Sequence, residues 1–208
     1  MRARFISLEG GEGVGKSTQA RRLAEAMRAR GIEVLLTREP GGSPGAEAIR
    51  QLLLEGEPNR WSPGAEALLF AAARADHVVK TIEPALEAGQ WVICDRFIDS
   101  SRAYQGIAGG VGDAAIQNLH QIGSDGLMPD RTLVLALTKA DAAARAHARD
   151  GGRPDRIGGR EAEFHAQVAQ AFSDFARDDP ERIRLVEASG SEEEVTARLL
   201  AALEDLLP

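Results

Sequence analysis

Short apolar runs alternate along the chain with longer segments in which apolar residues recur every three or four positions. The short runs predict strands and the periodic segments predict helices. The strands are expected at residues 4–8, 33–37, 91–95, 132–137 and 183–188. The helices are expected at residues 17–30 and 45–56, from about 65 to 89 with a break or bend at Pro84, from about 113 onward, and on both sides of the last strand. Alternating strands and helices predict an α/β fold, with a parallel sheet covered by helices on both faces.

Length and composition place this pattern in an ordinary globular protein. The 208 residues suit a single domain, expected to span residues 1–208, with 43% hydrophobic and 27% charged residues. The net charge of -7 argues against broad binding to nucleic acid or to an anionic membrane. The apolar run near the N-terminus is too short for a signal peptide or a membrane span, and the one cysteine, Cys94, excludes an internal disulfide. We therefore expect a cytoplasmic protein.

A glycine-rich segment between the first strand and the first helix carries the strongest signal. Gly10 to Ser17, GGEGVGKS, fits the phosphate-loop pattern G-x-x-x-x-G-K-S/T, for which the alternative is a turn that only caps a helix. The backbone N–H groups of such a loop face phosphates, Lys16 would reach the β- and γ-phosphates, and Ser17 would hold Mg²⁺. The residues expected to bind a nucleoside triphosphate, which the resemblance described below implies is ATP, are Gly10, Gly11, Glu12, Gly13, Val14, Gly15, Lys16, Ser17 and Thr18.

A second segment, T-K-A-D at residues 138–141, raises the possibility of a GTP-binding switch, because T-K-x-D after a buried strand reads guanine in many such proteins. A switch also needs Asp-x-x-Gly at the end of an earlier strand. Here Asp95 is followed three positions later by Ile98, and the Asp155–Gly158 match comes too late. Thr138 and Asp141 also fit the start of a helix with a capping box, which is the interpretation we favour.

Asp95 and Arg96 end the third predicted strand, where a carboxylate could hold Mg²⁺ opposite the phosphate loop. An arginine there is costly to bury without an anion, and its planar fork suits a phosphate. The alternative is a salt bridge at the end of the strand. Two anion-binding features at one crevice indicate two phosphate groups, a donor and an acceptor.

A third feature is a Gly-rich stretch that carries Arg145, Arg149, Arg153, Arg156 and Arg160. It is either a solvated basic surface or a mobile lid that closes on transferring phosphate, and the phosphate loop favours the lid, at about residues 149–160.

Taken together, these blocks resemble the thymidylate kinase family, the phosphate-loop enzymes that phosphorylate dTMP. The resemblance covers nearly the whole chain and rests on FISLEGGEGVGKST, TREPGG, LLFAAARADH, DRFIDSSRAYQG, PDRTLVLAL and the Arg-rich segment. It implies a P-loop NTPase fold with strand order 2-3-1-4-5, a single nucleoside monophosphate kinase domain, and the substrates ATP and dTMP with Mg²⁺. It also implies a homodimer, and a loop over the adenine near Ala188 to Ser191.

The resemblance also assigns roles in dTMP binding. Phe70 would stack on the thymine ring, Arg74 and Ser101 would bond its edge, and Tyr104 would crowd the sugar. From the residues alone, Phe70 and Arg74 are four positions apart on a helix and so share a face, although Phe70 taken singly fits a core position. The full set expected to bind dTMP is Glu12, Arg38, Pro40, Arg50, Phe70, Arg74, Arg96, Ser101, Tyr104 and Gln105.

The catalytic groups are expected to be cations. Gly13 stands where some family members carry a catalytic arginine in the phosphate loop, so the chain resembles the bacterial type with that arginine in the lid. The expected catalytic residues are Lys16, Arg96, Arg149 and Arg153, and the expected metal ligands are Ser17 and Asp95. The alternatives are a kinase for another pyrimidine nucleotide, a GTP-binding switch, and a non-catalytic nucleotide-binding module.

Overall fold

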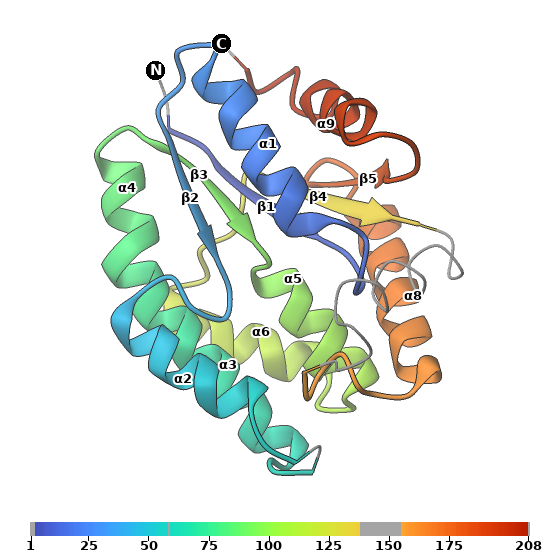
Figure 1. Cartoon of the computed structure of the whole chain (residues 1–208). Coiled ribbons are helices and arrows are strands. Elements are labelled where there is room, and N and C mark those ends of the chain that lie inside the picture. The colour runs from blue at the N-terminus through green and yellow to red at the C-terminus, as the bar shows by residue number, and fades with distance from the viewer. Residues whose placement is uncertain (1–2, 58, 138–154, 208) are drawn as a thin grey trace.

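Five parallel strands form the centre of the computed structural model, which describes residues 3–57, 59–137 and 155–207 (Figure 1). They are β1 (Phe5–Glu9), β2 (Val34–Arg38), β3 (Trp91–Asp95), β4 (Arg131–Ala136) and β5 (Ile183–Glu187). Their order in the sheet is β2-β3-β1-β4-β5, and every neighbouring pair is parallel. The predicted strand order is confirmed.

Helices cover both faces of this sheet. They are α1 (Lys16–Arg28), α2 (Pro44–Leu54), α3 (Pro63–His77), α4 (Glu83–Glu87), α5 (Ile98–Ser101), α6 (Asp113–Ser124), α8 (Ala162–Asp178) and α9 (Glu192–Ala201), with π-helical segments η1 (Val78–Ile82) and η2 (Arg102–Ala108). α1 and α9 lie on one face, and α3 to α6 and α8 lie on the other (Figure 1). Within the part of the chain that the structure describes, no helix is long and apolar enough to cross a membrane.

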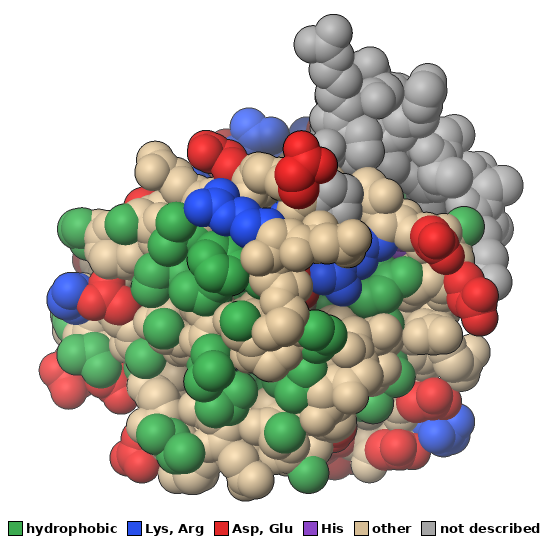
Figure 2. All heavy atoms as spheres, turned by 90° about the horizontal axis from the view of Figure 1, so that it is seen from below, with side chains coloured by type: hydrophobic (Ala, Val, Ile, Leu, Met, Phe, Trp, Pro, Cys, Tyr) green, Lys and Arg blue, Asp and Glu red, His purple; other side chains and the backbone are tan. Residues whose placement is uncertain are grey.

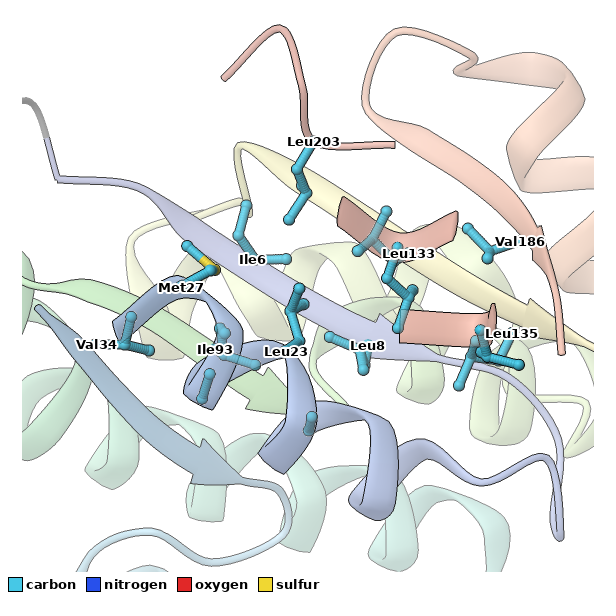
Figure 3. Close-up of a cluster of buried hydrophobic side chains, with 14 of the residues drawn as sticks. Ile6, Leu8, Leu23, Met27, Val34, Ile93, Leu133, Leu135, Val186 and Leu203 are labelled. Carbon is cyan, nitrogen blue, oxygen red and sulfur yellow. The ribbon is translucent and has the colours of Figure 1, made fainter. Parts of the chain in front are cut away.

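Side chains alternate between the two faces along the central strand. Ile6 and Leu8 pack against Leu23 and Met27 of α1 (Figure 3). Phe5 belongs to the cluster on the opposite face, where its ring meets the Phe97 ring edge-on at 4.7 Å between centroids. Burying each such side chain contributes about 1.5–3 kcal/mol. The sheet is therefore a rigid layer, and the loops at its carboxyl edge start from fixed positions.

Two elements differ from the expected pattern. The helical stretch expected around residues 65–89 continues from α3 through η1 into α4, and Pro84 lies in the first turn of α4, where its missing N–H is tolerated. The segment between β3 and α6, for which the sequence predicts no element, also contains helix, because α5 and η2 together extend from Ile98 to Ala108. Their start is stabilised by the buried carboxylate of Glu9, which accepts the backbone N–H groups of Phe97 at 2.7 Å and Ser100 at 3.2 Å. Because Glu9 lies 88 positions before Phe97, the sequence around Phe97 does not show that a helix begins there.

Candidate active site

A cavity of about 950 Å³ opens at the carboxyl ends of β1, β2 and β3, where ligands commonly bind in open α/β sheets. All ten residues expected to bind dTMP line it, as do Glu12 to Thr18 of the phosphate loop and Ala188, Gly190 and Ser191 of the expected adenine loop. Gly10 and Gly11 are absent from its lining. The backbone oxygen of Gly11 accepts a hydrogen bond from Lys16 at 2.6 Å.

The phosphate loop curls closely over the sheet between Glu9 and α1. Gly10 has φ +133°, and a Cβ there would lie 2.5 Å from the backbone oxygen of Leu135, so only glycine fits. The loop delivers Lys16 to the cavity as the first residue of α1. Burial, and secondarily the charge of Arg96, lowers the pKa of Lys16 to about 8. A phosphate bound beside this ammonium group would relieve both effects, since an opposite charge favours the charged form.

Two oxygen-bearing side chains meet beside the loop. The Ser17 hydroxyl donates to the Asp95 carboxylate at 2.5 Å. Hydroxyl and carboxylate oxygens suit Mg²⁺, which commonly takes one or two protein ligands and completes its shell with waters and substrate phosphates. Among the described residues no cluster of three or more His, Cys, Asp or Glu side chains could hold a metal. The Ser17–Asp95 pair thus offers two oxygen atoms of the kind that Mg²⁺ takes beside substrate phosphates.

Arg96 follows Asp95 and is placed by an unusual backbone. Its φ is +71°, in the left-handed region that non-glycine residues seldom adopt. The guanidinium donates to Glu12 at 2.5 Å, to Ser100 Oγ at 3.0 Å and to the backbone oxygen of Gly10 at 3.2 Å. It also lies 4.9 Å from the centre of the Tyr104 ring. These contacts hold a charged fork against the phosphate loop.

Two further arginines line the cavity near the end of β2. Arg38 pairs with Asp95 in the register of β2 and β3, and its guanidinium donates to Glu47 at 2.9 Å. Arg50 of α2 donates to the backbone oxygen of Pro40 at 2.6 Å, and the Glu39–Pro40 peptide bond is cis. With Arg96, these residues make one wall of the cavity cationic.

Another part of the lining has the features of a base site. Phe70 lines the cavity from α3, and no aromatic ring in the described ranges contacts its ring. One turn further, the Arg74 side chain is only 3% exposed and donates to Ser101 Oγ at 2.7 Å. No partner of Arg74 Nη1 is found among the described residues. The α3 face therefore presents a ring and a buried donor to the same space.

Glu39 is a site residue that the sequence interpretation missed, although it lies inside the TREPGG block. Its carboxylate accepts from Arg74 Nε at 2.8 Å and bonds His77 Nδ1 at 3.0 Å, while His77 Nε2 bonds Thr37 Oγ1 at 2.7 Å. The sequence did carry a signal for Glu39, because it stands directly between Arg38 and Pro40, which were both expected to line the site. Glu39 fixes the orientation of Arg74 from behind.

The expected lid is described only at its far end. Arg156 and Arg160 both donate to the buried carboxylate of Glu66 on α3, at 2.6 and 2.7 Å. These two arginines of the segment are therefore paired with a protein carboxylate. The expected catalytic residues Arg149 and Arg153, with Arg145 and the T-K-A-D segment, lie outside the described residues.

The strand order, the glycine-rich loop with Lys16 and Ser17, and the cavity at the carboxyl edge define a nucleotide-binding protein of the P-loop class. A family model described as thymidylate kinase matches residues 8–199. The chain belongs to the thymidylate kinase family.

Individual relatives agree with this membership. The chain is 62% identical to a thymidylate kinase of Rhizorhabdus wittichii over the full length of both proteins. It is 48% identical to a thymidylate kinase of Bradyrhizobium diazoefficiens, covering all of this chain and 92% of that one. Among solved structures, the thymidylate kinase of Ehrlichia chaffeensis superposes with a TM-score of 0.78 at 31% identity, covering 98% of this chain and 100% of that one.

Proposed function

We propose that the protein is an ATP-dependent thymidylate kinase, which transfers the γ-phosphoryl group of ATP to dTMP and yields ADP and dTDP. The observation that carries this function is the composition of one cavity, which is lined by the phosphate loop, by a cationic wall and by the Phe70–Arg74 face. A donor phosphate and a nucleoside monophosphate thus have adjoining places.

Phosphoryl transfer here needs no general base. A phosphate monoester has a second pKa of about 6 and is mostly a dianion at neutral pH, so an oxygen of the acceptor phosphate attacks the γ-phosphorus directly. The bond from that phosphorus to the bridging oxygen of ADP breaks. Lys16 and Arg96 bring two polyanions together and stabilise the charge that spreads over the transferring group.

Magnesium is the cofactor we propose, with Ser17 and Asp95 as the residues that would hold it. When bound, the ion supplies positive charge that neutralises the phosphate oxygens. The 2.5 Å contact between the Ser17 hydroxyl and the Asp95 carboxylate supports this pair as the protein's share of the ligands.

The acceptor is held by residues with distinct tasks. Arg38, Arg50 and Arg96 bind its phosphate, Phe70 stacks on thymine, and Arg74 donates to the base. Tyr104 occupies the sugar side, where its hydroxyl lies 3.3 Å from Glu12 Oε1. The expected catalytic residues Arg149 and Arg153 complete the proposal, as in the bacterial type whose catalytic arginine is in the lid.

A homodimer is the assembly we propose, through α3 and α6. Leu68 and Val79, from α3 and η1, and Ile122 of α6 are exposed large apolar side chains, and Gly123 of α6 lies against Ala75 of α3. Figure 2 views the molecule from below and shows hydrophobic side chains exposed among polar and charged ones on that side. Ile122→Glu should convert a dimer to a monomer in light scattering coupled to size exclusion. A wild-type monomer at micromolar concentration would contradict the assembly.

The function is tested by ADP release with ATP and magnesium against dTMP, dUMP, UMP, CMP, AMP and GMP. Turnover with dTMP and little with UMP supports the proposal, including the sugar contact at Tyr104. Preference for another pyrimidine monophosphate would keep the kinase and reject the base assignment. The absence of acceptor-dependent turnover, with tight guanine-specific binding, would support the GTP-binding alternative instead.

A further inference from the structure

Glu66 stands outside the roles assigned so far, yet it is among the most heavily bonded carboxylates of the described residues. Its side chain is 3% exposed and accepts hydrogen bonds from three other side chains. Arg156 donates at 2.6 Å, Arg160 at 2.7 and 2.8 Å, and Gln105 Nε2 at 3.0 Å. A buried carboxylate is costly unless its oxygens are satisfied, and here every partner comes from another segment.

The ion pairs of Glu66 hold residues 155–160 in place. Arg156 is fully buried and also donates from Nε to the backbone oxygen of Leu53 at 2.8 Å. Its neighbours Asp155 and Ile157 both line the cavity. The ion pairs of Glu66 therefore fasten residues 155–160 to the wall formed by α2 and α3.

Glu66 also bonds Gln105, which lines the same cavity and is 3% exposed. A primary amide has a donating end and an accepting end, and a carboxylate that two guanidinium groups hold only accepts. The amide must therefore turn Nε2 toward Glu66. No hydrogen bond to Gln105 Oε1 is found among the described residues, and Gln105 lines the cavity, so the accepting end is available to a ligand.

The orientation of the Gln105 amide matters because pyrimidine bases differ in the group that they present at N3. Thymine carries a ring N3–H that donates, whereas cytosine presents an unprotonated N3 that accepts. Glu66 and Phe70 are four residues apart on α3 and so share a face, and Gln105, which bonds Glu66, lines the same cavity as the Phe70 ring that we assign to base stacking. An accepting amide oxygen there attracts thymine and repels cytosine.

We infer that Glu66 is a positioning residue: it fixes the Gln105 amide with its oxygen toward the base, and it fastens segment 155–160 to the same wall. This inference rests on the proposed function, because it concerns the base of the acceptor. It assigns to Glu66 a share in the choice between thymine and cytosine without contact to either base.

The test compares kcat/KM for dTMP and for dCMP in wild type and in Glu66→Gln. A glutamine at position 66 can donate or accept, so the Gln105 amide loses its fixed orientation. The preference for dTMP over dCMP should fall by about tenfold or more, since a reversed hydrogen bond of this kind discriminates strongly. Glu66→Asp is the second variant, because it keeps the negative charge for the arginines but withdraws the carboxylate from Gln105. If Glu66→Gln does not fold, the same fall is expected in Glu66→Asp.

Arg160→Met is the matched control, since it removes a partner of the same carboxylate and leaves the bond to Gln105. It should keep the wild-type preference. In a Gln105→Ala background, Glu66→Gln should change the preference no further. An unchanged preference in the folded Glu66 variants, or an equal fall in Arg160→Met, would overturn the inference while wild-type turnover of dTMP leaves the proposed function standing. A wild type that does not phosphorylate dTMP would overturn both.

Discussion

Replacing Glu9 by glutamine should remove a specific part of the pH dependence of folding. The Glu9 carboxyl is fully buried at the end of β1, and it accepts from the backbone N–H of Phe97 at 2.7 Å and from the Ser100 hydroxyl at 2.5 Å. Burial, reinforced by the charge of Asp99, raises its pKa from 4.5 to about 7. The hydrogen bonds from Ser100 and Phe97 oppose the rise without cancelling it.

Proton linkage gives the direction and the magnitude of the effect of Glu9 on stability as pH changes. Between pH 4.5 and 7 the folded state holds a proton on Glu9 that the unfolded chain has lost, so stability falls as pH rises. The stabilising contribution is complete below the unfolded pKa and is lost as pH rises through the folded one. A shift from 4.5 to about 7 corresponds to about 3 kcal/mol.

Urea unfolding at several pH values between 5 and 8, followed by fluorescence of the buried Trp91, measures this effect. The unfolding free energy of wild type minus that of Glu9→Gln should decrease by about 2.5 kcal/mol between pH 5 and 8. Glu33→Gln, at an exposed position, is the matched control and should give a nearly constant difference. Parallel curves for wild type and Glu9→Gln would refute the reasoning, because the buried carboxyl would then titrate as in the unfolded chain.

Three other substitutions test separate parts of the account. Gly42→Ala would place a Cβ 2.3 Å from His77 Nε2 on a residue with φ +86°, and should lower the unfolding free energy by at least about 2 kcal/mol. Gly64→Ala is the control, because a Cβ there meets nothing within 4 Å, and equal thermal midpoints of the two variants would contradict the prediction. Arg96→Ala should lower kcat by about 10³-fold or more, and near-normal kcat in stopped-assay turnover would reject its catalytic role. Ser17→Ala should raise the Mg²⁺ concentration for half-maximal activity by about tenfold, and an unchanged magnesium titration would exclude Ser17 as a ligand.

The sheet and the phosphate loop were predictable because their signals are local. Apolar runs in β1 and β3 and the glycine pattern before Lys16 each report on a few consecutive residues, and parallel strands bring their carboxyl ends to one edge. The same rule placed Asp95 and Arg96 opposite the loop, although their individual roles stay predictions.

The buried carboxylates were not predictable, because each is defined by partners far away in sequence. Glu66 meets Arg156 and Arg160 across 90 and 94 positions, and Glu9 meets Phe97 across 88. In the sequence these arginines looked the same as their neighbours in an Arg-rich segment. Only the fold distinguishes an arginine that is paired with a protein carboxylate from one that is available to a phosphate.

The central claim, transfer from ATP to dTMP, is tested most directly by following the phosphoryl group itself. ATP labelled in the γ-phosphate is incubated with the protein, magnesium and dTMP, and the labelled products are separated. The account predicts that the label appears in dTDP in proportion to the ADP formed. Label that appears only in inorganic phosphate, or that remains in ATP, would contradict it.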